Sequence, residues 1–198
     1  PRVRVGTAVD EPLRVHGIAT GEAANERVGE LFELVGLERS MLRNFPHQFS
    51  GGQRQRVCIA RALALNPELV IADEAVSALD VSVQAQVMNL MLELQQELGL
   101  SYLFISHDLA VVERIAHRVA VMYLGQIVEL GTREQVFRNP THSYTKRLLD
   151  AVPIADPRQR NERPLLTGEI PSPVWPAGTG PEIVVHSEVE PGHIVADE

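Results

Sequence analysis

Two short apolar runs with a helical pattern between them limit what this chain can fold into more than any other feature of its sequence. The runs are residues 68–73 (ELVIAD) and residues 101–106 (SYLFIS). Between them, residues 82–98 repeat apolar side chains at helical spacing and end at Gly99. Continuously apolar strands separated by a helix are typical of a parallel sheet that is buried on both faces. The sequence therefore predicts an α/β fold with a mostly parallel sheet flanked by helices.

The rest of the chain extends this pattern and then departs from it. Glycines and a proline interrupt residues 1–20, which we expect to be irregular. Further helices are predicted over residues 21–36, 51–65, 108–116, 132–137 and 144–152, and two strands over 118–130 that turn at Gly125-Gln126. Beyond residue 153 prolines become frequent and the periodicity stops. We expect one domain over residues 1–152 and an irregular, proline-rich C-terminal tail over residues 153–198.

Charge and composition exclude several classes of protein. The net charge of −8 argues against binding of nucleic acid, because contacts to phosphates need a basic face. The single cysteine, Cys58, excludes an internal disulfide and is expected to be buried. His186 and His193 are too isolated to indicate a metal site and are expected at the solvated surface. No apolar run approaches the roughly 18 to 20 residues of a spanning helix, so any membrane contact is expected to go through a partner.

Ser50-Gly51-Gly52-Gln53 lies where a loop becomes a helix. The serine offers a hydroxyl, and the two glycines allow backbone N–H groups to approach a ligand closely. The partial positive charge of the helix start would favour an anion such as a terminal phosphate. The alternative is an ordinary N-terminal cap followed by a flexible glycine pair.

Three carboxylates and a histidine lie at or shortly after the ends of the apolar runs. Asp73-Glu74 ends the first run, Asp80 follows shortly after, and His107 ends the second. The carboxyl ends of parallel strands share one edge of a sheet, where open α/β folds bind ligands. There, one carboxylate could hold Mg²⁺ and the next could polarise an attacking water, while His107 could contact a γ-phosphate. Taken singly, an Asp-Glu pair at a strand end is more often a helix cap or a solvated turn, and a single histidine is by default an ordinary surface residue.

In this order and spacing the motifs are far more specific. The stretch PHQFSGGQRQRVCIARALALNPELVIADEAVSALD, followed by LFISHD, resembles the nucleotide-binding domain of ABC transporters, a P-loop NTPase fold. SGGQ is similar to the family's signature, LVIADE to its Walker B strand, SALD to its D-loop and His107 to its switch histidine. The resemblance implies ATP and Mg²⁺ as ligands and a dimer of two such domains. It also implies roles for the site residues: Glu74 would be the general base, His107 the γ-phosphate sensor and Asp73 the ligand of Mg²⁺. Asp80 would lie between the two ATP sites. The signature residues would face the ATP of the opposite domain, and they are Ser50, Gly51, Gly52 and Gln53.

A finer resemblance is to ATPases of peptide, dipeptide and nickel importers. It rests on MYLGQIVELG and FRNPTHSYTKRLLDAVP, while ADEAVSALDVSV resembles the ATPases of bacterial glutathione importers. It implies a subunit that energises import, bound peripherally at the cytoplasmic face of the inner membrane. Its partners would be a second ATPase domain, transmembrane permease subunits and, indirectly, a solute-binding protein.

The chain departs from the family in one respect, because it contains no G-x-x-x-x-G-K-S/T loop. Its first residues resemble the segment just after the family's Q-loop, so we expect the N-terminal part of the domain to be absent. The isolated chain is then expected to bind ATP poorly and to hydrolyse none. Two alternatives stay open, an inactive module that acts only in dimerisation or docking, and an ABC ATPase without a transport role.

Overall fold

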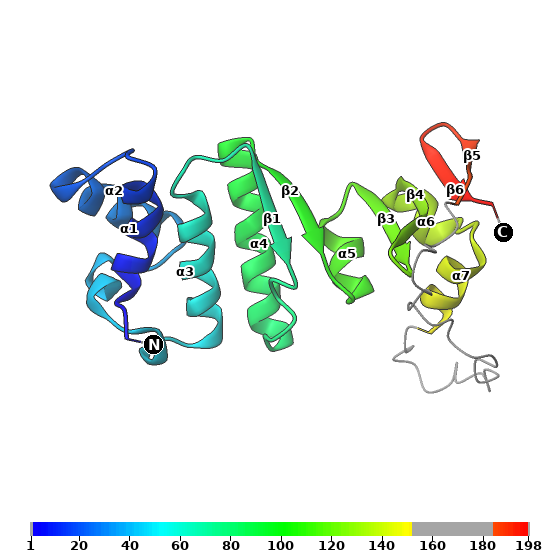
Figure 1. Ribbon diagram of the computed structural model, residues 1–198. Coiled ribbons are helices and arrows are strands. Elements are labelled where there is room, and N and C mark those ends of the chain that lie inside the picture. Colours follow the sequence, from blue (N-terminus) through cyan, green and yellow to red (C-terminus); the bar gives the residue numbers. More distant parts are fainter. Residues whose placement is uncertain (1, 152–183, 198) are drawn as a thin grey trace, which may run out of the picture. The chain divides into compact units, whose positions relative to one another are not determined.

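The computed structural model describes residues 2–151 and 184–197 of the 198-residue chain. Contacts between residues divide the chain into two compact units, Pro1–Asp108 and Leu109–Glu198 (Figure 1). The predicted domain boundary at residue 152 falls among residues outside the described ranges, so it stays a prediction. Among the described residues, no helix combines the length and apolar character needed to cross a membrane.

Helices make up the first half of unit 1. They are α1 (Val5–Val15), α2 (Gly21–Leu34), the short 3₁₀ helices η1 (Arg39–Arg43) and η2 (Pro46–Gln48), and α3 (Gly51–Leu63). The expectation of an irregular stretch over residues 1–20 is wrong, because Val5, Val9 and Leu13 recur every four residues and bury one face of α1. Gly6 suits this helix, since a Cβ there would lie 2.8 Å from the Leu42 carbonyl oxygen. The helices share a core that includes Leu31 and Phe32 of α2 and Ala60 of α3.

The strand–helix–strand unit forms as predicted. Strands β1 (Leu69–Asp73) and β2 (Ser101–Ile105) pair in parallel from Leu69 opposite Ser101 to Asp73 opposite Ile105. Helix α4 (Val81–Leu98) connects them and ends at Gly99, whose φ of 66° suits a glycine. Leu90 and Leu94 of α4 belong to the core, and Val70 of β1 and Tyr102 of β2 pack against it.

The two strands are not buried on both faces, which corrects the expectation from their sequence. Val70 and Tyr102 pack against the core, whereas Leu69 and Ile71 on the opposite face are 53% and 64% exposed. Leu103 and Ile105 on β2 are exposed to a similar degree. Alternate residues of a strand point to opposite faces, so covering one face leaves the other apolar row open. Cys58, expected to be buried, is also exposed.

Unit 2 is built around a four-stranded antiparallel sheet in the order β3-β4-β6-β5. Its elements are α5 (Leu109–Ile115), β3 (Arg118–Tyr123), β4 (Gln126–Thr132), α6 (Arg133–Arg138), α7 (Ser143–Asp150), β5 (His186–Glu190) and β6 (His193–Ala196). The β3–β4 turn lies at Leu124-Gly125, one residue before the predicted position, and both residues have positive φ. Within residues 2–151 and 184–197, the parallel pairing predicted from the sequence is thus confined to β1 and β2.

Residues 186–196 correct the prediction of an irregular tail. Strand β6 pairs with β4, with Glu129 opposite Val195 and Leu130 opposite Ile194, and β5 pairs with β6. Ala196 joins the apolar core under the sheet. These residues alternate too briefly to stand out as strands in the sequence, and their pairing depends on a partner strand far away in the chain. The prediction for residues 153–183 lies outside the described residues.

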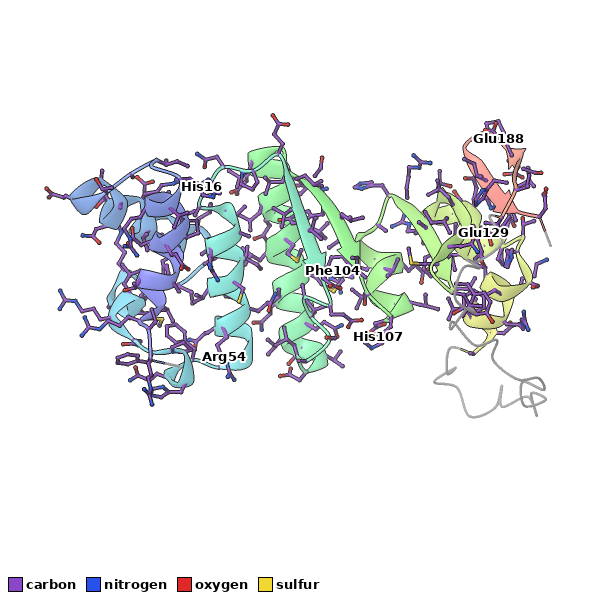
Figure 2. The ribbon with its side chains drawn as sticks, viewed as in Figure 1. His16, Arg54, Phe104, His107, Glu129 and Glu188 are labelled. Atoms are coloured by element: carbon purple, nitrogen blue, oxygen red, sulfur yellow. The ribbon has the colours of Figure 1, made fainter. Side chains whose placement is uncertain are left out.

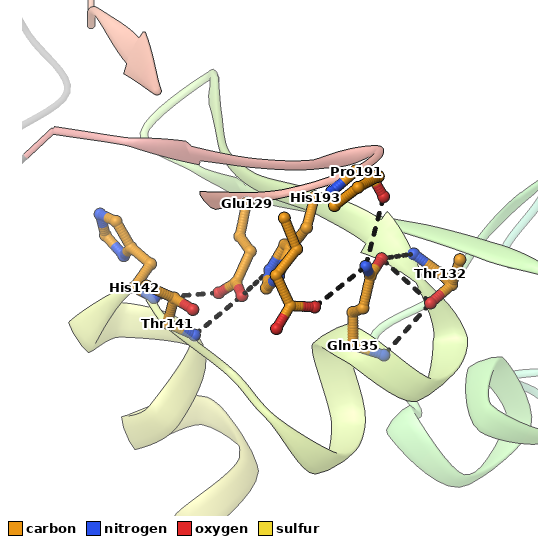
Figure 3. Close-up of polar contacts among 8 residues, drawn as sticks. Glu129, Thr132, Gln135, Thr141, His142, Pro191 and His193 are labelled. Carbon is orange, nitrogen blue, oxygen red and sulfur yellow. Dashed lines mark hydrogen bonds and ion pairs between the residues drawn. The ribbon is translucent and has the colours of Figure 1, made fainter. Parts of the chain in front are cut away.

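A buried glutamate and histidine fix the last strand to the sheet. Glu129 on β4 and His193 on β6 are 0% and 1% exposed, and His193 Nε2 lies 2.7 Å from Glu129 Oε1 (Figure 3). Backbone N–H groups of Thr141 and His142 also donate to this carboxylate, at 2.9 and 3.2 Å. His193 is therefore a structural residue of the core, contrary to the expectation of a solvated surface, whereas His186 is exposed as expected.

Candidate functional site

The carboxyl ends of β1 and β2 bring the predicted catalytic side chains to one edge of unit 1. Glu74 follows directly after β1, and its backbone N–H donates to the Ile105 carbonyl at the end of β2, at 2.9 Å. The Glu74 φ of 51° is left-handed, which is uncommon for a residue with a side chain. Such conformations are retained where surrounding contacts over-determine them, and they are frequent at functional sites.

Glu74 and His107 are in direct contact. Glu74 Oε1 lies 2.7 Å from His107 Nδ1, and both side chains are accessible, at 44% and 74% of their full exposure. The hydrogen bond from His107 lowers the pKa of Glu74, with a smaller contribution from Ser77. The same bond with Glu74 raises the pKa of His107. Each residue thus favours the charged form of the other.

The pairing determines which ring nitrogen of His107 is available. An ionised carboxylate only accepts hydrogen bonds, so Nδ1–H of the imidazole is the donor to Glu74. Nε2 is then left for another partner, and in the charged ring it is a donor suited to a phosphate oxygen. Glu74 keeps its second oxygen, Oε2, as an acceptor for a proton. Figure 2 shows His107 at the end of the strand that carries it, on the same side of unit 1 as Arg54 of α3.

Ser50 and Gln53 form a reciprocal cap at the start of α3. The Gln53 backbone N–H donates to Ser50 Oγ at 3.2 Å, and the Ser50 N–H donates to Gln53 Oε1 at 3.0 Å. The expectation of a helix start at this point is confirmed, and so is the capping role of the serine. Since each side chain accepts a hydrogen bond from the backbone N–H of the other residue, an anion would meet the remaining backbone N–H groups of the first turn.

Gly52 has a packing role that sequence reasoning did not anticipate. A Cβ at Gly52 would lie 2.4 Å from Val83 Cγ1, so only glycine fits against α4. At Gly51 the nearest atom to such a Cβ is the flexible tip of Leu79, at 3.2 Å. Gly52 therefore brings the first turn of α3 against the first turn of α4, whatever else the glycine pair does.

Asp80 caps the neighbouring helix, α4. Its Oδ1 accepts hydrogen bonds from the Val83 N–H at 3.0 Å and from the Ser82 hydroxyl at 2.7 Å. Chiefly the bond from Ser82 lowers the pKa of Asp80, so the group is an anionic cap. Val83 is thus held by Asp80 on one side and touches Gly52 on the other.

The predicted residues fall into two contacting sets within unit 1. Glu74 and His107 form one, and the first turns of α3 and α4 form the other, through Gly52, Val83 and Asp80. Asp73 is exposed at the end of β1. Among the described residues there is no group of three or more side chains with the spacing of a metal site. Val83, three residues after the SALD motif, was missed, and Ser77, the first residue of that motif, was given no role of its own.

Known protein families match two parts of the chain. Residues 2–77 match the ABC transporter family, and residues 128–178 match the C-terminal region of oligopeptide/dipeptide transporters. The chain is 60% identical over 197 residues to the glutathione import ATP-binding protein GsiA of Salmonella typhimurium and to that of Pectobacterium atrosepticum. It is 59% identical to GsiA of Escherichia coli strain K12.

The alignment covers 99% of this chain and 32% of each of these relatives, so the chain spans about a third of their length. The signature, strand and switch motifs lie together in unit 1, and the importer-type region begins within β4 of unit 2. Residues 2–77 are therefore similar to the ABC transporter family, and residues 128–178 to the C-terminal region of oligopeptide/dipeptide transporters.

Proposed function

We propose that this chain is part of an ATP-hydrolysing subunit that energises an ABC importer of peptides or glutathione-like solutes. The observation that carries the proposal is the 2.7 Å contact between Glu74 Oε1 and His107 Nδ1 at the carboxyl ends of two parallel strands. The relatives named above, whose own names describe glutathione import, support the solute class.

In this proposal Glu74 accepts a proton from the attacking water and His107 contacts the γ-phosphate. The pairing supports both roles, because it keeps the carboxylate ionised and presents the Nε2 side of the imidazole to a phosphate. The phosphate would meet Nε2, so His107 can keep its Nδ1 bond to Glu74 while it contacts the nucleotide. One histidine would thus link the proposed base to the γ-phosphate.

Asp73 is the proposed ligand for Mg²⁺. Mg²⁺ commonly binds through one or two carboxylates and completes its shell with waters and substrate phosphates. One exposed carboxylate at the end of β1 fits that mode, and so does the lack of a three-residue metal cluster in the described ranges. The ion would supply charge neutralisation for the phosphate oxygens.

We infer the remaining parts from the family. Ser50, Gly51, Gly52 and Gln53 would face ATP bound to a second ATPase domain, and Asp80 would lie between the two sites. The dimer would act with transmembrane permease subunits, and indirectly with a solute-binding protein, at the cytoplasmic face of the inner membrane. The exposed positions of Ser50 and Gly51 support such a contact.

The proposal is tested in a chimeric ATPase, in which this chain replaces the matching segment of the Escherichia coli GsiA relative. Glutathione-dependent growth and ATP turnover are measured together. Glu74→Gln is expected to lower turnover by roughly 10²–10⁴-fold, because the amide cannot accept the proton. Glu68→Gln, an exposed residue before the opposite end of β1, is the matched control and should leave turnover unchanged. Wild-type turnover in Glu74→Gln would contradict the proposal.

We also propose that the 198-residue chain alone does not turn over ATP, because its sequence contains no G-x-x-x-x-G-K-S/T loop to hold the phosphates. The purified chain is assayed with ATP and Mg²⁺ beside the chimeric ATPase. Phosphate release at the rate of the buffer blank is expected. Mg²⁺-dependent release by the chain that disappears in Glu74→Gln would contradict this inference.

A further inference from the structure

We propose that Ser77 is a positioning residue for Glu74, whose backbone it holds in the left-handed conformation through the Glu74 carbonyl. The Ser77 hydroxyl donates to that carbonyl oxygen at 3.0 Å, and the Ser77 N–H donates to the same oxygen at 3.3 Å. This inference rests on the proposed function of Glu74 as general base.

Glu74 is restrained at three points, and only one of them comes from the loop between β1 and α4. Its N–H bonds the Ile105 carbonyl and its side chain bonds His107, both on β2 or directly after it. Its carbonyl bonds Ser77 alone among the contacts described. Ser77 therefore restrains the carbonyl side of Glu74, while the bond to Ile105 restrains its N–H side, and together they hold the backbone that carries the carboxylate.

The loop that carries Ser77 is itself well anchored. Val76 is 2% exposed, and its carbonyl accepts from the Leu79 N–H at 3.2 Å. A fixed neighbour makes the Ser77 hydroxyl an effective restraint, because its own position is set by packing on one side and by a turn on the other. The left-handed backbone of Glu74 needs such a restraint, since an unrestrained glutamate prefers negative φ.

Loss of the Ser77 hydroxyl should act on catalysis by displacing the Glu74 carboxylate. Losing one hydrogen bond at an exposed loop changes overall stability little. A base that is displaced by about 1 Å, however, can lose up to roughly 10²-fold in rate. Ser77 should thus affect the turnover number far more than the stability of the fold.

The test uses the chimeric ATPase and four variants. Ser77→Ala is expected to lower kcat about tenfold and to leave the KM for ATP within about twofold, because nucleotide contacts are unchanged. Ser77→Thr keeps the hydroxyl and should restore kcat to within about threefold of the parent. Ser40→Ala is the matched control, since the Ser40 hydroxyl also makes one exposed hydrogen bond, to Glu38 at 3.0 Å, away from the site. It should behave as the parent.

The fourth variant, Glu74→Gln with Ser77→Ala, separates this inference from the proposed function. If Ser77 acts through Glu74, the double variant turns over ATP no more slowly than Glu74→Gln alone. A kcat of Ser77→Ala equal to that of the parent overturns the positioning role. So does a tenfold loss of kcat that Ser77→Thr fails to restore, or a double variant that is tenfold slower than Glu74→Gln alone. Those results leave Glu74 as the base if Glu74→Gln alone is inactive, whereas an active Glu74→Gln overturns the proposed function itself.

Discussion

Replacing Gly52 by alanine should destabilise unit 1, although alanine is the better helix former. The added Cβ would lie 2.4 Å from Val83 Cγ1, more than 1 Å inside the usual carbon–carbon contact of about 3.5–4.0 Å. Relieving an overlap of this kind in a packed site costs about 1–3 kcal/mol. The higher helix propensity of alanine offsets up to about 1 kcal/mol. The expected net loss is therefore about 1–2 kcal/mol.

Native-state hydrogen exchange of α3 and α4 amides is the suitable assay, because it reports on unit 1 separately from unit 2. Gly51→Ala is the matched control one residue away. Its Cβ would meet only the flexible end of Leu79 at 3.2 Å, so this variant should be neutral or slightly stabilising.

The Val83→Ala background makes the reasoning refutable. Without the Val83 Cγ1 atom the overlap disappears, so Gly52→Ala should cost nothing there, and the two substitutions should be strongly non-additive. An equal cost of Gly52→Ala in both backgrounds would show that contact with Val83 is not the reason for glycine at this position.

Three further outcomes are expected in the purified chain. His193→Ala should destabilise unit 2 by about 3 kcal/mol, because it leaves a buried carboxylate with one hydrogen-bond donor fewer. His186→Ala, on the exposed strand β5, is the control and should cost about 0.5 kcal/mol or less. Equal losses of stability for the two variants in urea unfolding would contradict this. Burial raises the pKa of Glu129, but hydrogen bonds from Thr141, His193 and His142 help to outweigh it, and the pKa lies below its ordinary value of 4.5. The lowered pKa of Glu129 stabilises the folded state above pH 4.5, and this stabilisation is lost as the pH falls through the folded pKa. The difference in unfolding free energy between wild type and Glu129→Gln should therefore shrink on acidification. A difference that does not depend on pH would refute this prediction. Ser50→Ala should lower the stability of α3 by about 1 kcal/mol while Ser50→Asn retains most of it, as hydrogen exchange can show.

Local sequence patterns were sufficient to predict a helix or strand wherever that segment contained its own capping residue, terminating glycine or apolar run. The cap at Ser50, the end of α4 at Gly99 and the parallel pairing of β1 with β2 could all be predicted. Helix α1 was missed because Pro12 and Gly6 weighed against it. The burial of Val5, Val9 and Leu13 and the close approach of Gly6 to Leu42 overcome that local preference.

In the candidate site, too, sequence motifs predicted some features, whereas others depend on tertiary contacts. The motifs led to Glu74 and His107, and the structure brings the two into contact. The packing of Gly52 on Val83 and the hold of Ser77 on Glu74 depend on distances that spacing along the chain does not encode. The role of His193 depends on a partner 64 residues earlier, and no periodicity in its own segment reveals that partner.

The pairing of β6 with β4 has a consequence for the timing of folding during synthesis. Glu129 leaves the ribosome 64 residues before the histidine that bonds it. At a synthesis rate of about 5–20 residues per second, His193 emerges roughly 3–13 s after Glu129, so the carboxylate lacks this partner during that time. Throughout this interval the β3–β4 hairpin presents the edge of β4 without the strand that later covers it. A nascent chain is therefore most exposed to mispairing or capture by a chaperone in the seconds before residue 196 emerges.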